Sequence, residues 1–253
     1  MKIIALGTGT SQGVPVIGCQ CEVCLSKDIR DKRTRSSIYI ESEKTKLLID
    51  IGPDFRSQFL DNQLSTVDAV LITHEHNDHI IGLDDIRAIN FTQKKSIPFY
   101  MQQRVLDEVK YRFDYAFKAS KYPGLPQIDL HLISESVWQY KDLDITPINI
   151  MHGRLPILGY RINNMAYITD ASVIPDTEWS KLENLDVLII NALRKTPHHS
   201  HFTLDEALVA AKRIGANKTY ISHISHLMGK AEEWSQELPD NVSPLQDKMI
   251  LEC

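Results

Sequence analysis

The sequence lacks the features that mark membrane proteins and proteins that coat nucleic acid. Its 253 residues carry 28 Lys and Arg against 33 Asp and Glu, a net charge of −5, with no long block of one sign. Such a balance offers no broad basic surface to a phosphate backbone. No apolar run approaches the ~18 residues of a membrane span, and no cationic leader precedes residues 2–6. We therefore expect a cytoplasmic protein, with neither a membrane nor extended nucleic acid as its partner.

Cysteine is scarce and unevenly placed. Of the four cysteines, Cys19, Cys21 and Cys24 fall within six residues, which is too crowded for a disulfide framework. Three thiolates at this spacing can occupy three corners of a zinc tetrahedron, and the fourth ligand must then come from elsewhere. Buried free cysteines are the alternative, but a loop flanked by Gly and Pro is an unusual place for them. The segment 19–24 therefore predicts a structural zinc.

The glycine-rich stretch 7–13 lacks the endings that would make it a nucleotide site. No Lys-Ser or Lys-Thr pair closes it and no clear helix follows, so it fails both the P-loop and the dinucleotide fingerprints. We interpret its glycines as serving tight turns and close backbone approach.

Histidine is the residue that is present in an informative pattern. The apolar run 69–72 predicts a buried strand, and His74, His76, Asp78 and His79 follow it directly. Apolar residues at helical spacing over 80–95 predict a helix next, so these side chains lie where α/β proteins bind ligands. Positions i and i+2 point one way from an extended segment, and i+4 and i+5 fall on the next turn. One loop can thus serve two neighbouring metals; histidines that merely cap the helix are the weaker interpretation.

Three further candidates each follow an apolar strand. His152, Asp170 and His223 lie at or just past the ends of expected strands, and this repetition suggests one shared site. Asp50, at the end of another strand, is either a turn residue or a carboxylate that orients a metal-bound histidine. We expect strands at 2–6, 36–41, 46–50, 128–133, 137–140, 143–150, 159–162, 165–169, 186–191, 218–222 and 249–251, and helices at 105–117 and 203–214.

A second histidine-rich segment precedes the helix expected at 203–214. We interpret His198 and His199 as loop residues. His201 lies just before the helix, where a donor can meet a substrate anion.

The ordered set His74-x-His76-x-Asp78-His79, His152, Asp170 and His223 resembles the metallo-β-lactamase superfamily. The resemblance implies an α/β fold, a four-layer αββα sandwich of two mixed sheets with helices outside, spanning 1–253 as a single domain. It also implies two metals at one edge of the sheets. His74, His76 and His152 would hold the first metal. Asp78, His79 and His223 would hold the second, and Asp170 would bridge the two.

A narrower resemblance joins Cys19-x-Cys21-x2-Cys24 to His223-Ile-Ser-His226. With the opening at residues 7–15, this pattern resembles the branch that contains the phosphoribosyl 1,2-cyclic phosphate phosphodiesterase of the carbon–phosphorus lyase pathway. The resemblance implies one structural zinc on Cys19, Cys21, Cys24 and His226. It also gives His201 the position of a substrate-contacting acid. Residues 100–130 carry no matching motif.

Together these residues predict a metal-dependent hydrolase. A His and Asp ligand set suits Zn, Mn or Fe, and two such ions can share a hydroxide and clamp a phosphodiester. We expect a small cyclic or nucleotide-like phosphodiester as substrate, with Asp78 and His201 in catalytic roles. A tRNA 3′-processing endonuclease shares the ligands but normally carries a basic arm that this sequence lacks, and lactamase or thioesterase activity needs the same metals. A non-enzymatic zinc module is the remaining alternative, and a homodimer is left open.

Overall fold

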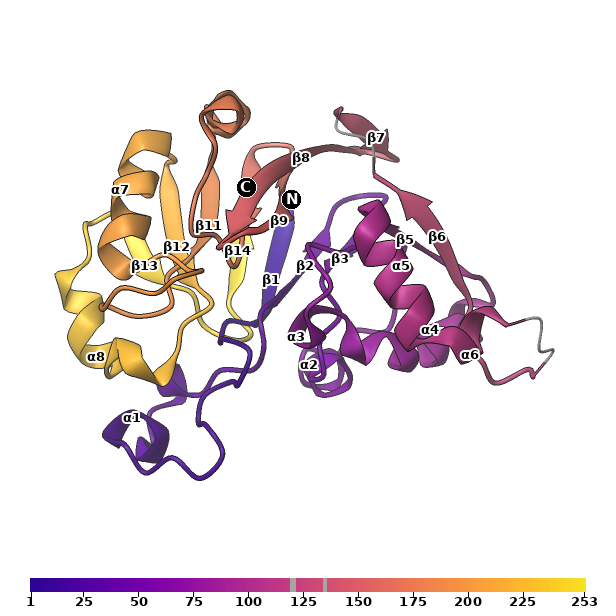
Figure 1. Ribbon diagram of the computed structural model, residues 1–253, viewed down its shortest axis with the longest axis horizontal. Coiled ribbons are helices and arrows are strands. Elements are labelled where there is room, and N and C mark those ends of the chain that lie inside the picture. Colours follow the sequence, from indigo (N-terminus) through magenta and orange to yellow (C-terminus); the bar gives the residue numbers. More distant parts are fainter. Residues whose placement is uncertain (119–121, 134–135) are drawn as a thin grey trace.

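Two seven-stranded mixed sheets form the centre of the computed structural model, which describes residues 1–118, 122–133 and 136–253. The strand order is β14-β1-β2-β3-β4-β5-β6 in the first sheet and β13-β12-β11-β10-β9-β8-β7 in the second (Figure 1). The first sheet comprises β1 Lys2–Gly7, β2 Ser37–Glu41, β3 Lys46–Ile49, β4 Ala69–Leu71, β5 Ile97–Met101, β6 Ile128–Leu132 and β14 Ile250–Glu252. The second comprises β7 Trp138–Tyr140, β8 Leu143–His152, β9 Leu155–Ile162, β10 Met165–Ile168, β11 Val187–Asn191, β12 Lys218–Ser222 and β13 Val242–Pro244.

Alternation along the strands builds three apolar layers. Ile38 and Ile40 of β2 point between the sheets and pack in one cluster with Tyr160 and Ile162 of β9, whereas Tyr39 points outward. Outside the first sheet lie α2 Phe55–Asp61, α4 Ile86–Gln93 and α5 Gln103–Arg112, and outside the second lie α7 Leu204–Ile214 and α8 Ala231–Trp234 (Figure 1). The expected αββα sandwich is confirmed.

Two predicted helices are interrupted. The helix expected over 80–95 is divided into α3 Asn77–Ile80, the 3-10 turn η2 Ile81–Asp85 and α4. The cause is a close approach at Gly82, where an added Cβ would lie 2.0 Å from the Gly52 carbonyl oxygen. The helix expected over 105–117 is α5 followed, after Phe113, by α6 Asp114–Phe117. The shorter elements are α1 Glu22–Leu25, η1 Ile29–Asp31, η3 Asp176–Leu182, η4 His226–Met228 and η5 Ser235–Glu237.

Strand direction explains why distant residues meet. In the second sheet β10, β11 and β12 are parallel, and β8 shares their direction because β9 is antiparallel to both β8 and β10. In the first sheet β3 and β4 are parallel. The Tyr160 hydroxyl of the second sheet donates to the Ile72 carbonyl of the first at 2.6 Å. The carboxyl ends of these strands therefore converge on one edge of the sandwich.

None of the helices within the described ranges has the length and apolar character needed to cross a bilayer.

Candidate metal centre

The seven histidines and aspartates predicted as ligands come together at the convergent strand ends. Their ligand atoms form overlapping groups, each within 4.8 Å: His74, His76 and His152; His74, His79 and Asp170; Asp78, Asp170 and His223; and His152, Asp170 and His201. Asp170 belongs to three of these groups, which is the position that a bridging ligand requires. The predicted first set, His74, His76 and His152, recurs as one of these groups, whereas His79 is grouped with His74 and Asp170 and not with Asp78 and His223. The division into two ligand sets and the metal-binding roles stay predictions.

Asp50 supports two of the histidines from behind. His79 Nδ1 donates to Asp50 Oδ2 at 2.7 Å. Thr73 Oγ1 lies 2.9 Å from the same carboxylate oxygen and 3.0 Å from His74 Nδ1, so it can donate to Asp50 and accept from His74. In the neutral form of either ring this arrangement leaves the proton on Nδ1 and the lone pair on Nε2, which is the nitrogen needed for a metal. Of the two interpretations that the sequence left open for Asp50, the geometry favours the orienting carboxylate.

The other two strand-end histidines also have oxygen neighbours at Nδ1. His152 Nδ1 donates to the Ser200 carbonyl at 2.7 Å. His223 Nδ1 lies 3.2 Å from Asp170 Oδ2 and 3.3 Å from Ser36 Oγ, which itself donates to the Gly9 carbonyl at 2.9 Å. The glycine-rich stretch thus supports the site from below: an added Cβ at Gly9 would lie 2.9 Å from the Arg33 side chain. Close backbone approach, as predicted, explains these glycines.

Buried ring nitrogens show that a metal fits this cluster. Among the described residues, His223 Nε2 and His201 Nδ1 are buried and have no hydrogen-bond partner. His79 Nε2 lies 3.1 Å from Asp78 Oδ2 and 3.3 Å from Asp170 Oδ2. Leaving a buried polar atom unpaired costs about 1–3 kcal/mol. Imidazole nitrogens and carboxylate oxygens are the ligands that zinc, manganese and iron accept. The donor set therefore matches divalent metal ions.

The charges of the cluster are arranged around His79 and Asp170. Although burial opposes the change, the surrounding carboxylates, Asp78 foremost, raise the pKa of His79 well above its ordinary value. Against the same opposing burial, His223 and His79 hold the pKa of Asp170 well below its ordinary value. Burial lowers the pKa of His74 and of His223, so both rings are neutral near pH 7, as metal ligands must be.

Three residues of the cluster have a strained backbone. Asp50, Asp170 and His223 adopt φ values of 63°, 58° and 54°, in the left-handed region that costs a residue other than glycine about 1–3 kcal/mol. Each lies one or two residues past the end of a strand of the convergent edge. Such strain persists where the surrounding structure enforces it, and it is typical of functional sites.

His201 lies inside the cluster and not at its rim. Its side chain is 9% exposed, and its ring centroid is 4.6 Å from that of His152 and 5.0 Å from that of His223. Burial lowers the pKa of His201 to about 3, so the ring is neutral near pH 7. The sequence suggested a protonated donor; here a proton would have to be stabilised by the negative charge of a bound substrate.

The cysteine cluster is a second and separate ligand set. His226 Nδ1 lies 3.4 Å from Cys19 Sγ, 3.3 Å from Cys21 Sγ and 3.5 Å from Cys24 Sγ. Zinc–sulfur and zinc–nitrogen bonds of about 2.3 and 2.0 Å at a tetrahedral angle place S and N about 3.5 Å apart. Hydrogen bonds from the Cys24 amide and then His226 lower the pKa of Cys21 to about 6, which favours the thiolate. These four side chains, called here the Cys3His knot, fit a structural zinc.

An open cleft of about 800 Å³ leads to the ligand cluster. Its lining includes His76 and His152 from the cluster together with Arg154, His198 and His199. The loop interpretation of His198 and His199 describes their backbone, but it missed their place in the cleft. Their position next to His201 in the sequence is the signal that could have shown it.

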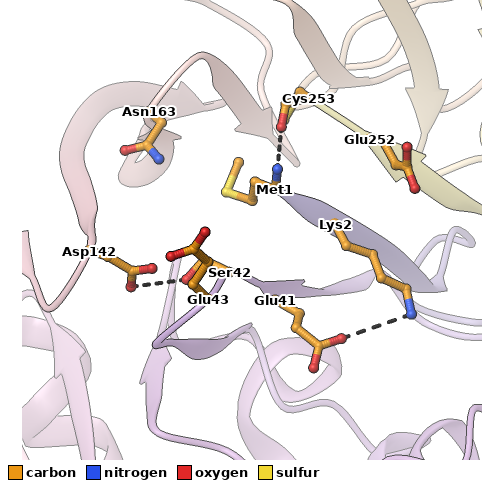
Figure 2. A pocket seen from close by; sticks show the side chains of 9 residues that line it. All are labelled: Met1, Lys2, Glu41, Ser42, Glu43, Asp142, Asn163, Glu252 and Cys253. Carbon is orange, nitrogen blue, oxygen red and sulfur yellow. Dashed lines mark hydrogen bonds and ion pairs between the residues drawn. The ribbon is translucent and has the colours of Figure 1, made fainter.

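Another pocket, of about 680 Å³, lies at the opposite ends of the strands. Figure 2 shows its lining of Met1, Lys2, Glu41, Ser42, Glu43, Asp142, Asn163, Glu252 and Cys253. Glu41 pairs with Lys2 at 3.9 Å, and Ser42 Oγ donates to Asp142 at 3.0 Å. No histidine is among its lining residues, in contrast to the cleft that leads to the ligand cluster.

Several supporting residues escaped the sequence analysis. Arg104 of α5 pairs with Glu75, and Arg112 of the same helix donates to the Glu75 carbonyl at 2.7 Å, so α5 clamps the loop that carries His74 and His76. The Asn191 side chain donates to the Ala171 carbonyl at 3.0 Å and accepts from its amide at 2.8 Å, beside Asp170. Asn191 lies at the end of a buried strand, and this position could have identified it as a candidate from the sequence. No local sequence pattern indicated the contacts of Arg104 and Arg112.

Comparison with known proteins agrees with this fold and site. The family model described as a beta-lactamase superfamily domain matches residues 45–224. The chain therefore belongs to the metallo-β-lactamase superfamily, whose fold and His/Asp centre define a metal-dependent hydrolase. Within it the chain falls in the PhnP family: it shares 37% identity and a TM-score of 0.93 with the crystal structure of a new diphosphatase from that family, over 99% of this chain and 96% of the other.

Two other relatives extend the comparison. An octanoyltransferase from Porphyromonas gingivalis is 42% identical over 245 residues, which are 96% of this chain and 49% of that protein. The chain thus spans about half the length of this curated relative. Zn²⁺-bound PqqB from Methylobacterium extorquens has a TM-score of 0.83 at 18% identity, with 100% of both chains covered, and shows the shared fold.

Proposed function

We propose that the protein is a binuclear metal-dependent phosphodiesterase that opens a small cyclic or nucleotide-like phosphodiester. The observation that carries the proposal is the position of Asp170, whose carboxylate joins three ligand groups. Two further members of these groups, His76 and His152, line a cleft of about 800 Å³. Such a carboxylate can hold two ions side by side, and two neighbouring ions can bind both the attacking and the leaving oxygen of a phosphodiester. A diphosphate ester presents the same kind of target, a phosphorus atom that is linked to other groups through two of its oxygens.

In the proposed reaction, different residues of the chain bind metal, orient the ligands and donate a proton. His74, His76 and His152 would hold one ion, and Asp78, His79 and His223 the other, with Asp170 shared between them. When bound, the two ions would lower the pKa of water and offset the charge of the phosphate. Asp50 keeps the ring of His79 in place through the 2.7 Å hydrogen bond to Nδ1. A ring N–H of His201 would donate to the leaving oxygen, and the buried position of His201 excludes competing water.

The relatives support phosphorus chemistry more directly than acyl transfer. The diphosphatase of the PhnP family aligns over nearly the whole of both chains, whereas the octanoyltransferase is about twice as long as the matched region. An acyl enzyme on cysteine has no candidate in the cleft: three cysteines surround His226, and Cys253 lines the pocket at the opposite edge. We therefore do not assign acyl transfer to this chain.

Hydrolysis of bis(p-nitrophenyl) phosphate tests the proposal. Purified protein loaded with Zn²⁺ or Mn²⁺ should release p-nitrophenol, and His76→Ala should reduce the rate to background while the Cys3His knot keeps its zinc. A screen of cyclic and linear phosphodiesters and nucleoside diphosphate esters would then rank the substrates. Inactivity of the wild type with either metal would refute the proposal.

A further inference from the structure

Arg33 and Asp247 carry charges within the protein that the proposed chemistry does not use. Arg33 is 5% exposed, and Asp247 is partly buried near the end of the chain. Both lie outside residues 45–224, which match the superfamily model. Removing a charge from water is costly unless other groups of the protein stabilise it, so the contacts of these two side chains show what they support.

The hydroxyl of Thr8 joins the two charges. Arg33 Nη1 donates to Thr8 Oγ1 at 2.8 Å, and Thr8 Oγ1 donates to Asp247 Oδ1 at 2.7 Å. Burial lowers the pKa of Arg33 to about 10, so the guanidinium is still charged near pH 7. A hydroxyl that accepts from a cation and donates to an anion is held more strongly than one between neutral partners. These three side chains are called here the Thr8 bridge.

Both ends of the Thr8 bridge have further bonds. Arg33 Nη1 also donates to the Leu245 carbonyl at 2.6 Å. Asp247 Oδ2 accepts from the amide and from the hydroxyl of Thr34, each at 2.7 Å. Because the guanidinium and the carboxylate are each held by other partners, the fully buried Thr8 between them has a fixed position.

The backbone around Thr8 holds the turn that carries His223. The Ile224 amide donates to the Thr8 carbonyl at 3.0 Å, and the Thr10 amide donates to the Ile224 carbonyl at 3.2 Å. Both backbone groups of the residue after His223 are thus bound to the segment 8–10. His223 has a φ of 54°, a strained conformation that persists only where the surrounding contacts enforce it. The segment that the Thr8 bridge fixes supplies part of that enforcement.

We propose that the Thr8 bridge positions His223 to bind the second metal ion. The inference rests on the metal centre of the proposed function and on no particular substrate. Residues behind the ligands fix the orientation of each ring, and a ring that is already oriented loses less entropy on binding a metal. Loss of the Thr8 hydroxyl would leave the two charges without their common partner, so the segment 8–10 would shift and the affinity for this ion would fall.

Thr8→Val and Thr8→Ser form a matched pair of variants. Thr8→Val removes the hydroxyl at nearly constant shape, whereas Thr8→Ser keeps the hydroxyl and removes a methyl group. Competition between the zinc-loaded protein and a chromogenic chelator should show that Thr8→Val binds one of the two active-site ions about tenfold less tightly than wild type. Thr8→Ser should restore most of that affinity, and the Cys3His knot should keep its zinc in both variants.

Thr45→Val is the control for a general loss of stability. Thr45 is also buried, and its hydroxyl donates to Asp142 at 2.5 Å, beside the pocket at the opposite edge. This variant should lower the melting temperature and leave the affinity for both active-site ions unchanged. If Thr8→Val lowered the melting temperature but bound both ions as wild type does, Thr8 would have a structural role only and the proposal would be overturned. Equal losses of metal affinity in Thr8→Val and Thr45→Val would also overturn it.

Asp247→Asn tests the other end of the Thr8 bridge and does not depend on the folding of Thr8→Val. It removes the charge at constant shape and should weaken the binding of the same ion, whereas wild-type affinity for both ions would contradict the positioning role. None of these measurements uses a phosphodiester. If wild type failed to hydrolyse bis(p-nitrophenyl) phosphate, the proposed function would fall and the metal affinities would still decide the role of Thr8. Unchanged affinities in an active enzyme would overturn only the positioning role.

Discussion

The Cys3His knot and the His/Asp centre share the segment 223–226, yet they are built in opposite ways. The knot takes three ligands from residues 19–24 of one loop, and its residues are partly exposed except for the buried Cys24. The His/Asp centre draws its ligands from four places, the loop 74–79 and the residues His152, Asp170 and His223, all at strand ends. A structural site needs only a complete ligand set, whereas a catalytic site also needs supporting hydrogen bonds and access for a substrate.

The shared segment couples the two sites mechanically. Ile224 donates to the Thr8 carbonyl at 3.0 Å, and Ser225 Oγ donates to the Leu193 carbonyl at 2.8 Å. His223 points to the His/Asp centre on one side of these bonds, and His226 points to the knot on the other. In Figure 1 the α1 segment projects from the sandwich near α8, so the knot ties this projection to the turn that ends in His226. Variants that affect one site and spare the other can measure this coupling.

The largest effect is expected from the shared carboxylate. Asp170→Asn removes the charge that three ligand groups have in common, so hydrolysis of bis(p-nitrophenyl) phosphate should fall to background. Metal analysis should show loss of the active-site ions and retention of one zinc in the knot. Asp176→Asn, at a side chain 94% exposed on η3, is the control and should behave as wild type. Loss of knot zinc in Asp170→Asn would show that the two sites are not independent.

The knot should govern stability and not chemistry. Cys21→Ala removes one of four zinc ligands, and loss of a structural metal belongs among the substitutions that cost more than about 4 kcal/mol. For a chain of this size, we expect the melting temperature to fall by about 10 °C or more. Cys253→Ala removes the cysteine outside the knot and is the matched control. A melting temperature of Cys21→Ala equal to that of wild type would contradict a structural role for the knot.

Removing the charge of the carboxylate that holds His79 should have an intermediate effect, on the affinity for the active-site ions. Asp50→Asn keeps the shape of the side chain but removes the charge that accepts the 2.7 Å bond from His79 Nδ1. Substitutions of this kind typically lower metal affinity about 10–100-fold. Competition with a chromogenic chelator would measure the affinity of the active-site ions, and the knot zinc should be unaffected. Unchanged affinity would make Asp50 a turn residue, the other interpretation of its position.

The contrast between the local Cys3His knot and the dispersed His/Asp centre explains which features the sequence could predict and which it could not. The ligands were recognisable because each follows an apolar run, and strand direction then brings His152, Asp170 and His223 to one edge. The break at Gly82 was not predictable, because it depends on the Gly52 backbone, which is distant in sequence. The same holds for the Arg104–Glu75 pair, whose members are 29 residues apart.

Burial was the other property that the sequence did not reveal. The sequence placed His201 near a substrate, but its charge state depends on its packing against the rings of His152, at the end of β8, and His223, just after β12. These neighbours exclude water, and the resulting desolvation reverses the expectation of a protonated side chain.

The smallest expected effect concerns the pH dependence of stability. The pKa of His201 is lowered to about 3 in the folded protein and is near 6.5 in the unfolded chain, so the unfolded state binds more protons between these values. The stability that this group contributes is therefore complete above pH 6.5 and is lost as the pH falls toward 3. His201→Gln has no such group, so between pH 7 and pH 5 the metal-free variant should lose up to about 2 kcal/mol less than metal-free wild type. Urea denaturation of both proteins at the two pH values measures the difference. Identical losses would mean that His201 is not desolvated in the folded protein, and the contrast between a buried catalytic cluster and a partly exposed knot would weaken accordingly.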